Sequence, residues 1–308
     1  TEPMTALTQM YSLPAYNGVD PNPLMLPFFP LYFGIMFADL AYGLLLTFGG
    51  IFLYGKTKKR GGTMKYFGGM MIECGVMASI FGALTGGFFG DAPTQVAAMF
   101  GIDFVMPALI QPIEDPLPIL VLSLVLGIIQ MLFAVCVNGW LIVRDGSKAD
   151  AFWEVAPVFV VFVGLALGAL GISWIPEIVG IVMVVYAQGR ASESIGGKIG
   201  NGIYGLYSFV SGWFGDVLSY SRLMALMLSG SVIAQVFNSL GAMGGLPVVF
   251  VLVFLIGHAL NIALNLIGCF VHALRLQYLE YFGKFYREGG KPFTPLAVKT
   301  KYVDIKED

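Results

Sequence analysis

The residues best suited to act on an ion are two arginines, Arg222 and Arg275, each inside a long apolar stretch of the sequence. A lone guanidinium near the centre of a bilayer costs about 2.5–3.5 kcal/mol on insertion scales. Each arginine therefore needs a counter-charge, a path for water or a function. Two of them in one chain favour ion translocation.

A stripe of polar residues leads to the second arginine. Spacings of 3, 4, 3, 4 and 3 residues place its members on one helix face, and they are His258, Asn261, Asn265, Gly268, His272 and Arg275. A single polar group in a membrane helix commonly serves only as interhelical hydrogen-bond glue, worth about 0.6 kcal/mol. Positions in register that include both histidines favour a hydrated face that lines an ion path. His258, Asn261, Asn265 and His272 are therefore candidate channel residues.

The helix that carries Arg222 has a different character. The side of the arginine is small or apolar, a surface along which another helix could slide, and consists of Ser219, Ala225, Leu226, Ser229 and Ile233. The opposite side carries Ser231, Gln235 and Asn238. Counting outward from a turn near Gly244 along regular helices predicts that Arg222 is level with Asn265, with Arg275 nearer the cytoplasm.

Three further polar residues are candidates. Glu73 lies within an apolar stretch and is either a channel group or a buried, protonated or hydrogen-bonded carboxyl. Asp216, two turns before Arg222, either pairs with a basic residue or serves a cytoplasmic half-channel. Ser219, on the arginine's side, is a candidate channel residue.

The composition is that of an integral membrane protein. Hydrophobic residues make up 57% of the chain and charged residues only 12%, against about 25% charged in an average soluble protein. A net charge of −2 without a basic cluster argues against nucleic acid as a partner. The 3 cysteines lie in apolar runs without a CxxC pair, so we expect buried thiols and no metal or cofactor site.

The apolar stretches predict a polytopic all-α protein. Four stretches are near or above the roughly 20 residues that a crossing needs, namely 65–90, 117–144, 151–172 and 247–280. Residues 175–188 predict a shorter crossing, and 203–240 a very long segment that bends or breaks around Gly212 to Gly215. The block 24–54 carries Asp39 at its middle, which fits two short crossings joined by a turn as well as one tilted span. Eight crossings follow from the first alternative and seven from the second.

Basic residues gather in alternate loops. They lie in 56–65, 144–148, 190–198 and the tail from 284, whereas 91–116, 171–176 and 241–246 carry no Lys or Arg. By the positive-inside rule the basic loops and the C-terminus are cytoplasmic.

Both ends of the chain carry a family resemblance. FGDVLSYSRLMALMLSGSVIA (214–234) and IGCFVHALRLQYLEYFGKFYREGGKPFTPL (267–296) resemble the last two membrane helices of the rotary ATPase stator subunit. This is subunit a of vacuolar ATPases and subunit I of archaeal and bacterial A/V-type ATPases. MYSLPAYNGVDPNPLMLPFFPLYFGIMFADLAYG (10–43) resembles the beginning of its membrane domain, so the resemblance covers essentially the whole chain.

The resemblance implies a fold, an organisation and partners. It implies an N-terminal cytoplasmic domain outside this chain and favours about eight transmembrane helices, the last two long and tilted. It divides the chain into a connecting segment (1–23), an ion-translocating transmembrane domain (24–283) and a cytoplasmic tail (284–308). The implied partners are a proteolipid rotor ring, a peripheral stalk, other rotary ATPase subunits and membrane lipid.

The resemblance also implies roles for the two arginines. In the family, the arginines of the SYxRL-type and HALRL-type motifs face the rotor ring, and these match Arg222 and Arg275. Eukaryotic relatives have a glutamate and a histidine where this chain has Asn265 and Gly230, which indicates the prokaryotic branch and its plasma membrane.

The expected function is translocation of H⁺ or Na⁺ by the stator subunit of a rotary ATPase, with no catalytic site of its own. An ion-coupled secondary transporter is the alternative, but the chain lacks the matching halves that such transporters show. A structural anchor is a third reading, and it has no need of intramembrane arginines. GIFLYGKT (50–57) matches a phosphate-loop pattern, but we expect its middle residues to be the end of a membrane helix.

Overall fold

The computed structural model describes residues 2–58, 63–190, 194–244 and 247–290, and this part of the chain is helical without a strand. The N-terminal helices are η1 (Glu2–Met4), α1 (Thr5–Tyr11), α2 (Asn22–Met25), α3 (Phe28–Met36), α4 (Leu40–Thr57), α5 (Thr63–Thr85) and α6 (Ala92–Met99). The remaining helices are α7 (Leu117–Arg144), α8 (Lys148–Ala169), α9 (Ile175–Gly189), α10 (Ile195–Ser219), α11 (Ser221–Met243), α12 (Pro247–Arg275), a π-helix η2 (Leu276–Tyr281) and η3 (Phe282–Lys284).

Within the described residues, five helical segments are long and apolar enough to cross a membrane. They include the predicted spans at α5, α7 and α8, and the two longest are Gly196–Met243 and Pro247–Lys284. The shorter apolar segments are Asn22–Met36 and Ile175–Gly189. The prediction of an all-α polytopic membrane protein with two long final helices is confirmed.

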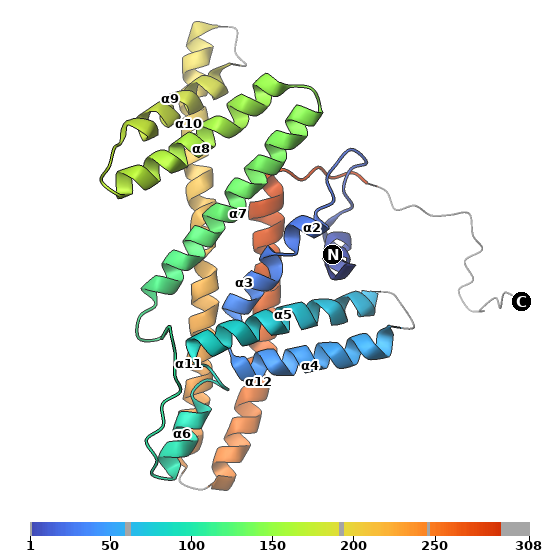
Figure 1. Ribbon diagram of the computed structural model, residues 1–308, viewed down its shortest axis with the longest axis vertical. Coiled ribbons are helices and arrows are strands. Elements are labelled where there is room, and N and C mark those ends of the chain that lie inside the picture. Colours follow the sequence, from blue (N-terminus) through green and yellow to red (C-terminus); the bar gives the residue numbers. More distant parts are fainter. Residues whose placement is uncertain (1, 59–62, 191–193, 245–246, 291–308) are drawn as a thin grey trace, which may run out of the picture.

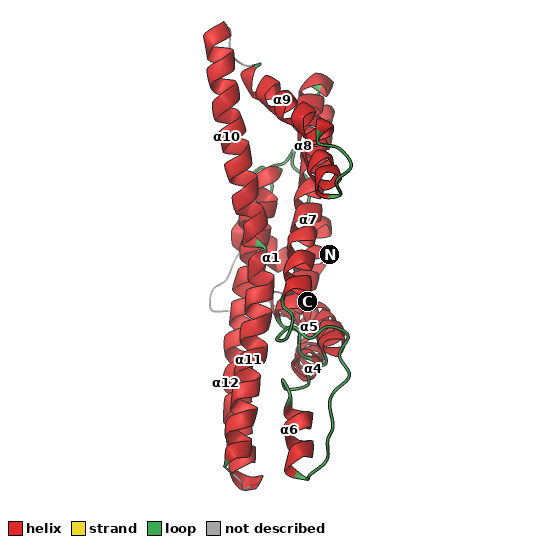
Figure 2. Ribbon diagram, turned by 90° about the vertical axis from the view of Figure 1, so that its left-hand side faces the viewer, coloured by secondary structure: helices red, strands yellow, loops and turns green. Residues whose placement is uncertain are grey.

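The long C-terminal helices form one side of the molecule. Figure 2 shows α10, α11 and α12 as an elongated column, with α4 to α9 along one side of it. In Figure 1 the ends of α4, α7 and α9 lie to the right and top, and the ends of α5, α8 and α11 lie to the left and bottom. The pairs α4 and α5, α7 and α8, and α11 and α12 therefore run in opposite directions, whereas α11 continues in the direction of α10.

The block 24–54 is interrupted at Asp39, as the two-helix alternative requires. Asp39 has an extended backbone and caps α4, because its carboxylate accepts hydrogen bonds from the backbone N–H groups of Ala41 (3.0 Å) and Tyr42 (3.1 Å). It also accepts from the N–H groups of Phe89 (3.2 Å) and Gly90 (2.7 Å), beyond α5. Residues 50–57 lie in the last turns of α4, so they are a helix end, as expected, and not a phosphate loop.

Glycines allow α4 and α5 to pack closely. A Cβ at Gly43 would lie 2.5 Å from the backbone N of Ser79, and one at Gly82 would overlap the backbone of Asp39 and Leu40. Such close backbone approach by small residues is how membrane helices associate. The pair therefore holds the Asp39 cap in place.

The predicted break around Gly212 to Gly215 is wrong, because α10 continues through both glycines to Ser219. The interruption is at Tyr220, where the backbone N–H bonds to the carbonyl of Val217 (3.1 Å) in a tighter turn. The Tyr220 side chain is fully buried and its hydroxyl donates to Gln130 Oε1 (2.8 Å). A Cβ added at Gly212 or Gly215 would meet no other atom within 4 Å, so close packing does not require a bend at these glycines. At Tyr220, by contrast, the side chain packs against Gly127 of α7, and this contact accompanies the interruption.

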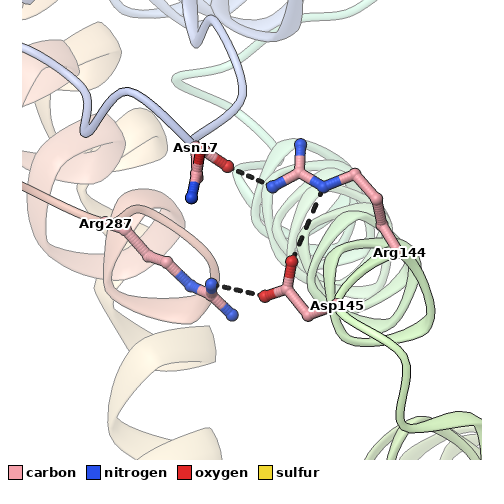
Figure 3. A network of polar contacts seen from close by, with 4 residues as sticks. All are labelled: Asn17, Arg144, Asp145 and Arg287. Carbon is pink, nitrogen blue, oxygen red and sulfur yellow. Dashed lines mark hydrogen bonds and ion pairs between the residues drawn. The ribbon is translucent and has the colours of Figure 1, made fainter.

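Polar contacts tie the two ends of the described chain to the turn after α7. Figure 3 shows Asp145 between Arg287, whose Nη1 donates to Oδ2 at 2.7 Å, and Arg144, which also bonds the carbonyl of Asn17. The hydrogen bond and charge of Arg287, with the charge of Arg144, hold the pKa of Asp145 below its usual value. Tyr286 also donates to the carbonyl of Ser12 (2.6 Å). Most of the predicted tail, 291–308, lies outside the described residues.

Candidate functional site

Arg222 lies in the first turn of α11, directly after the interruption at Tyr220. Its Nη2 donates to the Ser219 hydroxyl (3.0 Å) and forms an ion pair with Glu280 Oε1 at 3.6 Å. The arginine side chain is 25% exposed and the glutamate side chain 5%. Within the described residues, Arg222 Nη1 and Glu280 Oε2 are buried without a hydrogen-bond partner. The site is thus a guanidinium that is charge-neutralised but incompletely bonded.

The register of α11 against α12 differs from the one predicted. Asn265 lies against Gly230, where a Cβ would approach its amide nitrogen to 2.9 Å, and Gly268 lies against Leu226. One turn further along the pair, Arg222 faces His272, and the charge of Arg222 acts on that ring. The expectation that Arg222 is level with Asn265 is therefore wrong. It assumed a turn at Gly244, but the contacts of Gly230 with Asn265 and of Gly268 with Leu226 pair the two helices about a point near Pro247.

Arg275 also approaches His272. It is exposed, it acts electrostatically on the histidine, and it has no ion pair or hydrogen bond within the described residues. His272 is partly buried, and its Nδ1 has no hydrogen-bond partner there. The charges of both arginines therefore act on one imidazole, and Arg222 has a buried counter-ion whereas Arg275 has no ion pair within the described residues.

The N-terminal part of the polar stripe, His258, Asn261 and Asn265, is hydrogen-bonded to its neighbours and is here named the wall. His258, Asn261 and Asn265 are buried, at 3%, 0% and 8% exposure. His258 bonds Tyr42 through Nδ1 and Asn238 through Nε2 (2.9 Å). Asn261 donates to the Tyr42 hydroxyl (3.1 Å), and Asn265 donates to Asn261 Oδ1 (2.7 Å). Most of the polar atoms on this part of the stripe are thus engaged with α4, α11 or one another.

Two cavities lie beside this wall. The larger one, of about 300 Å³, is here named the loop cavity, and its lining includes Asp39, Asp91, Gln111, Glu114, Ser231 and Gln235. A small cavity of about 20 Å³ is lined by Asp39, Ser231 and Asn265 among others, so it shares two lining residues with the loop cavity. The small cavity is roughly large enough for one water molecule. The two cavities therefore adjoin at Asp39 and Ser231, between the 85–114 region and Asn265.

Asp216 is paired with a basic residue, the first of its two alternatives. Its Oδ2 accepts from Lys284 Nζ at 2.5 Å, and that ammonium lies 4.9 Å from the centroid of the Trp213 ring. Lys284 and Trp213 line two cavities of about 600 and 440 Å³, here named the Lys284 cavities. The larger also contains Asp150 and Glu154. Cavities thus lie beside the long helical segment both before Arg222, at Trp213 of α10, and after it, at Ser231 of α11.

Glu73 is separate from these groups. It lies in the middle of α5, partly buried, and its Oε2 has no hydrogen-bond partner within the described residues. Within the described part of the chain, no hydrogen bond or ion pair joins it to either arginine or to the wall, and it lines none of the cavities named above. Ser219, by contrast, directly bonds Arg222.

Sequence reasoning missed three contributors to the site. Tyr42 reads as an ordinary aromatic residue, and nothing in its spacing indicates that it bonds His258. Glu280 is the last residue of the apolar stretch 247–280, where a carboxylate reads as an interfacial residue. Gln130 in α7 joins Tyr220 to Gln277 (2.9 Å), and a glutamine within a 28-residue apolar helix is the one signal that could have pointed to it.

The arrangement can act electrostatically on charged groups that approach Arg222. No group of His, Cys, Asp and Glu that could hold a metal occurs among residues 2–58, 63–190, 194–244 and 247–290. What the site offers is a fixed positive charge between polar cavities, with carboxylates near each cavity. Such a charge favours the ionised form of any carboxyl that approaches within about 4–6 Å.

No protein-family model matches the chain. It is 33% identical to A-type ATP synthase subunit I of Methanocaldococcus jannaschii over 98% of this chain and 48% of the relative. It is 33% identical to the same subunit of Pyrococcus horikoshii over 97% of this chain and 46% of the relative. V-type ATP synthase subunit I of Chlamydia pneumoniae is 26% identical over 94% of this chain. The chain spans about half the length of the curated relatives it matches.

Proposed function

We propose that this chain, which belongs to the subunit I family of the A-type and V-type ATP synthases, translocates H⁺ or Na⁺ as the stator of a rotary complex. The observation that carries the proposal is the state of Arg222, a partly buried guanidinium in an apolar helix with one nitrogen unbonded in the described part of the chain. ATP chemistry belongs, in this proposal, to other subunits.

The exposed face of α11 and α12 is the surface for the rotor ring of proteolipid subunits. On α11 it consists of Ala225, Ser229, Val232 and Val236, and on α12 of Leu264, Ile267, Val271 and Arg275. The other side of α11 contacts α3, α6 and α7. A mostly apolar surface of small and aliphatic side chains suits a partner that must move past it, and Arg222 lies in the first turn of the same α11.

The arginine acts on a carboxylate carried by the ring. The guanidinium favours the ionised form of an approaching carboxylate, since an opposite charge nearby commonly lowers the pKa of a carboxyl by about 1–3 units. The ring carboxylate must therefore release its ion before it passes. Arginine suits this role because it stays protonated when it is desolvated. The same positive charge blocks direct passage of cations between the small cavity and the Lys284 cavities. Ions can then cross only on the moving ring, which couples ion flow to rotation.

The loop cavity and the small cavity are the outer half-channel of this proposal. Asp39 and Ser231 line both, and Asn265 lines the inner one. His258 and Asn261 then form the wall that holds Asn265 and Tyr42 in position. The Lys284 cavities, with Asp216 at their edge, are the cytoplasmic half-channel, and His272 lies between the two arginines.

The proposal includes an orientation and an organisation. The basic loops and the segment from residue 284 face the cytoplasm of a prokaryotic cell, and 91–116 faces outward, in keeping with the alternating helix directions (Figure 1). Residues 1–23 connect to the rest of the subunit, and 24–283 form the ion-translocating domain. The peripheral stalk and other subunits contact the cytoplasmic side.

The test is ATP-driven ion uptake by the intact complex in proteoliposomes, normalised to assembled complex. Arg222→Ala abolishes uptake and leaves assembly largely intact, because a ring carboxylate then passes without unloading. Arg222→Lys fails or nearly fails, because an ammonium lacks the planar fork and loses its proton when desolvated. Uptake at the parent level by Arg222→Ala would refute the proposal. Ion-coupled solute uptake without a ring would instead indicate a secondary transporter.

A further inference from the structure

Helix α12 does not end at Arg275 but continues as the π-helix Leu276–Tyr281. Short π segments in helices occur frequently at functional sites. This one buries polar side chains, since Gln277 is 0% and Glu280 4% exposed. Within the described residues, three polar atoms of the segment are buried without a partner, Gln277 Nε2, Glu280 Oε2 and the Tyr281 hydroxyl.

The π-helix faces the interruption between α10 and α11. Gln277 accepts from Gln130 Nε2 (2.9 Å), and Gln130 accepts from the Tyr220 hydroxyl (2.8 Å). Glu280 pairs with Arg222, two residues after Tyr220. Two independent contacts thus join the π-helix to the residues that set the position of Arg222.

Arg222 and Glu280 neutralise each other's charge but do not form a close, bidentate ion pair. A strong arginine–carboxylate pair is bidentate, with N···O distances of about 2.7–2.9 Å. Here the single contact is 3.6 Å, and each partner keeps one unbonded atom in the described part of the chain. A buried carboxylate that loses its partner is strongly unfavourable. Arg222 can therefore turn to another carboxylate only if Glu280 gains a cation in exchange.

We propose that Glu280 exchanges the transported cation with the rotor carboxylate through Arg222. This inference rests on the proposed function and deepens it. In one step, the ion-loaded rotor carboxylate releases its cation and pairs with Arg222, while Glu280 leaves Arg222 and takes up that cation. For H⁺, one carboxyl O–H bond breaks and another forms through water. For Na⁺, one carboxylate coordination replaces another.

The step keeps the local charge constant. Before it, the ion pair and the loaded rotor carboxylate are both neutral, and after it the new ion pair and the loaded Glu280 are both neutral. Glu280 then delivers the cation to the Lys284 cavities, since Lys284 follows it by four residues in the same helical segment. Reversal of the step runs the transport in the other direction.

The test contrasts two variants in the intact complex in proteoliposomes, normalised to assembled complex. Glu280→Gln keeps the length and an accepting oxygen but cannot carry a cation, so ATP-driven uptake falls roughly tenfold or more. Glu280→Asp keeps the charge at a shorter reach and retains a clearly larger share. A merely positional role predicts the reverse order, so equal losses or better survival of Glu280→Gln would overturn the proposal. Glu177→Gln, at the start of α9, is the matched control and pumps like the parent.

A second measurement does not depend on rotation. Carbodiimides modify carboxyls that hold a proton, and removal of Arg222 takes away the charge that is paired with Glu280. Carbodiimide therefore labels Glu280 in the assembled Arg222→Gln complex and not in the resting parent, as measured by peptide mass spectrometry. Equal labelling in both would overturn the exchange. Should Arg222→Ala abolish uptake while Glu280→Gln pumps normally, the exchange fails and the proposed function stands.

Discussion

The phenol oxygen of Tyr42 and the Nδ1 atom of His258 share a hydrogen bond that joins α4 to α12 across 216 positions of the chain. The other ring nitrogen of His258 bonds Asn238 in α11 (2.9 Å), and the same phenol accepts from Asn261 (3.1 Å). Three helices thus converge on one imidazole. This makes the histidine a structural centre beside the proposed outer half-channel.

Tyr42→Phe removes this junction without changing the shape of the ring. It leaves His258 Nδ1 buried and unbonded, and we expect a loss of about 1–2 kcal/mol of unfolding free energy. Thermal unfolding of the purified complex or subunit in detergent measures the loss. Tyr207→Phe, at an exposed tyrosine in α10, is the control and leaves the transition unchanged. A parent-like transition for Tyr42→Phe would show that the junction contributes nothing.

Water access distinguishes the cavity route from the stripe as the channel surface. In a background with Cys74, Cys136 and Cys269 replaced, cysteines at Ser231 and Gln235 react with small polar thiol reagents from the side of the 91–116 segment. Both positions line the loop cavity. A cysteine at Asn261, which is 0% exposed, reacts at least about tenfold more slowly.

A control position outside both cavities completes this experiment. Val232 is exposed on α11 but lines neither cavity, so a cysteine there reacts poorly with a polar reagent in sealed vesicles. Equal reactivity at positions 231 and 232 would contradict the cavity route. Faster reaction at position 261 than at 231 would favour the stripe itself as the hydrated surface.

The sequence predicted the elements better than their relative register. Asp39 at the middle of an apolar block correctly indicated the helix interruption, because a carboxylate there suits a helix cap. The boundaries of α7 matched the prediction, since Pro116 and Arg144 flank the apolar run. The predicted height of Arg222 relative to α12 was wrong because it depended on the position of the turn between the two helices. Each residue by which such a turn is misplaced shifts a helix by about 1.5 Å.

The site residues beyond the stripe were harder to predict for a physical reason. After Arg275 the backbone changes from α to π geometry, so positions beyond it cannot be placed on a face by continuing the 3.6-residue period. Glu280 therefore fell outside the stripe. The break at Tyr220 arises from a tertiary contact with Gln130, which no local propensity encodes.

Close packing of α4 on α5 makes Gly82 sensitive to the smallest side chain. A Cβ there would overlap the backbone of Asp39 and Leu40, which cannot move as a flexible side chain would. We expect Gly82→Ala to cost about 1–3 kcal/mol of stability, as overpacking does, and to reduce uptake through displacement of the Asp39 cap. Gly55→Ala, whose Cβ meets nothing within 4 Å, is the control in the same pair of helices. Thermal unfolding that is equal for the two variants would contradict this account.

Acid weakens the tie between the end of the described chain and the turn after α7. The pKa of Asp145 is lowered chiefly by the hydrogen bond from Arg287. A lowered pKa means that the stabilisation is fully present above the ordinary value and is lost as the pH falls through the lowered value. Spin labels at positions 16 and 147 should therefore separate below about pH 4, and in Asp145→Asn they should be separated at every pH. A distance independent of pH in the parent would contradict the prediction.

The two arginines differ in their surroundings, and this predicts unequal effects of their removal. Arg222 has a buried counter-ion and sits at the interruption of the long helix, whereas Arg275 is exposed and has no ion pair within the described residues. Water can share the role of Arg275, and Arg222 remains beside His272 to repel cations. Arg275→Ala therefore retains at least about tenfold more ATP-driven uptake than Arg222→Ala, measured in proteoliposomes and normalised to assembled complex. Loss of uptake only in Arg275→Ala would show that the principal coupling arginine is the exposed one, and that the buried pair of Arg222 and Glu280 is structural.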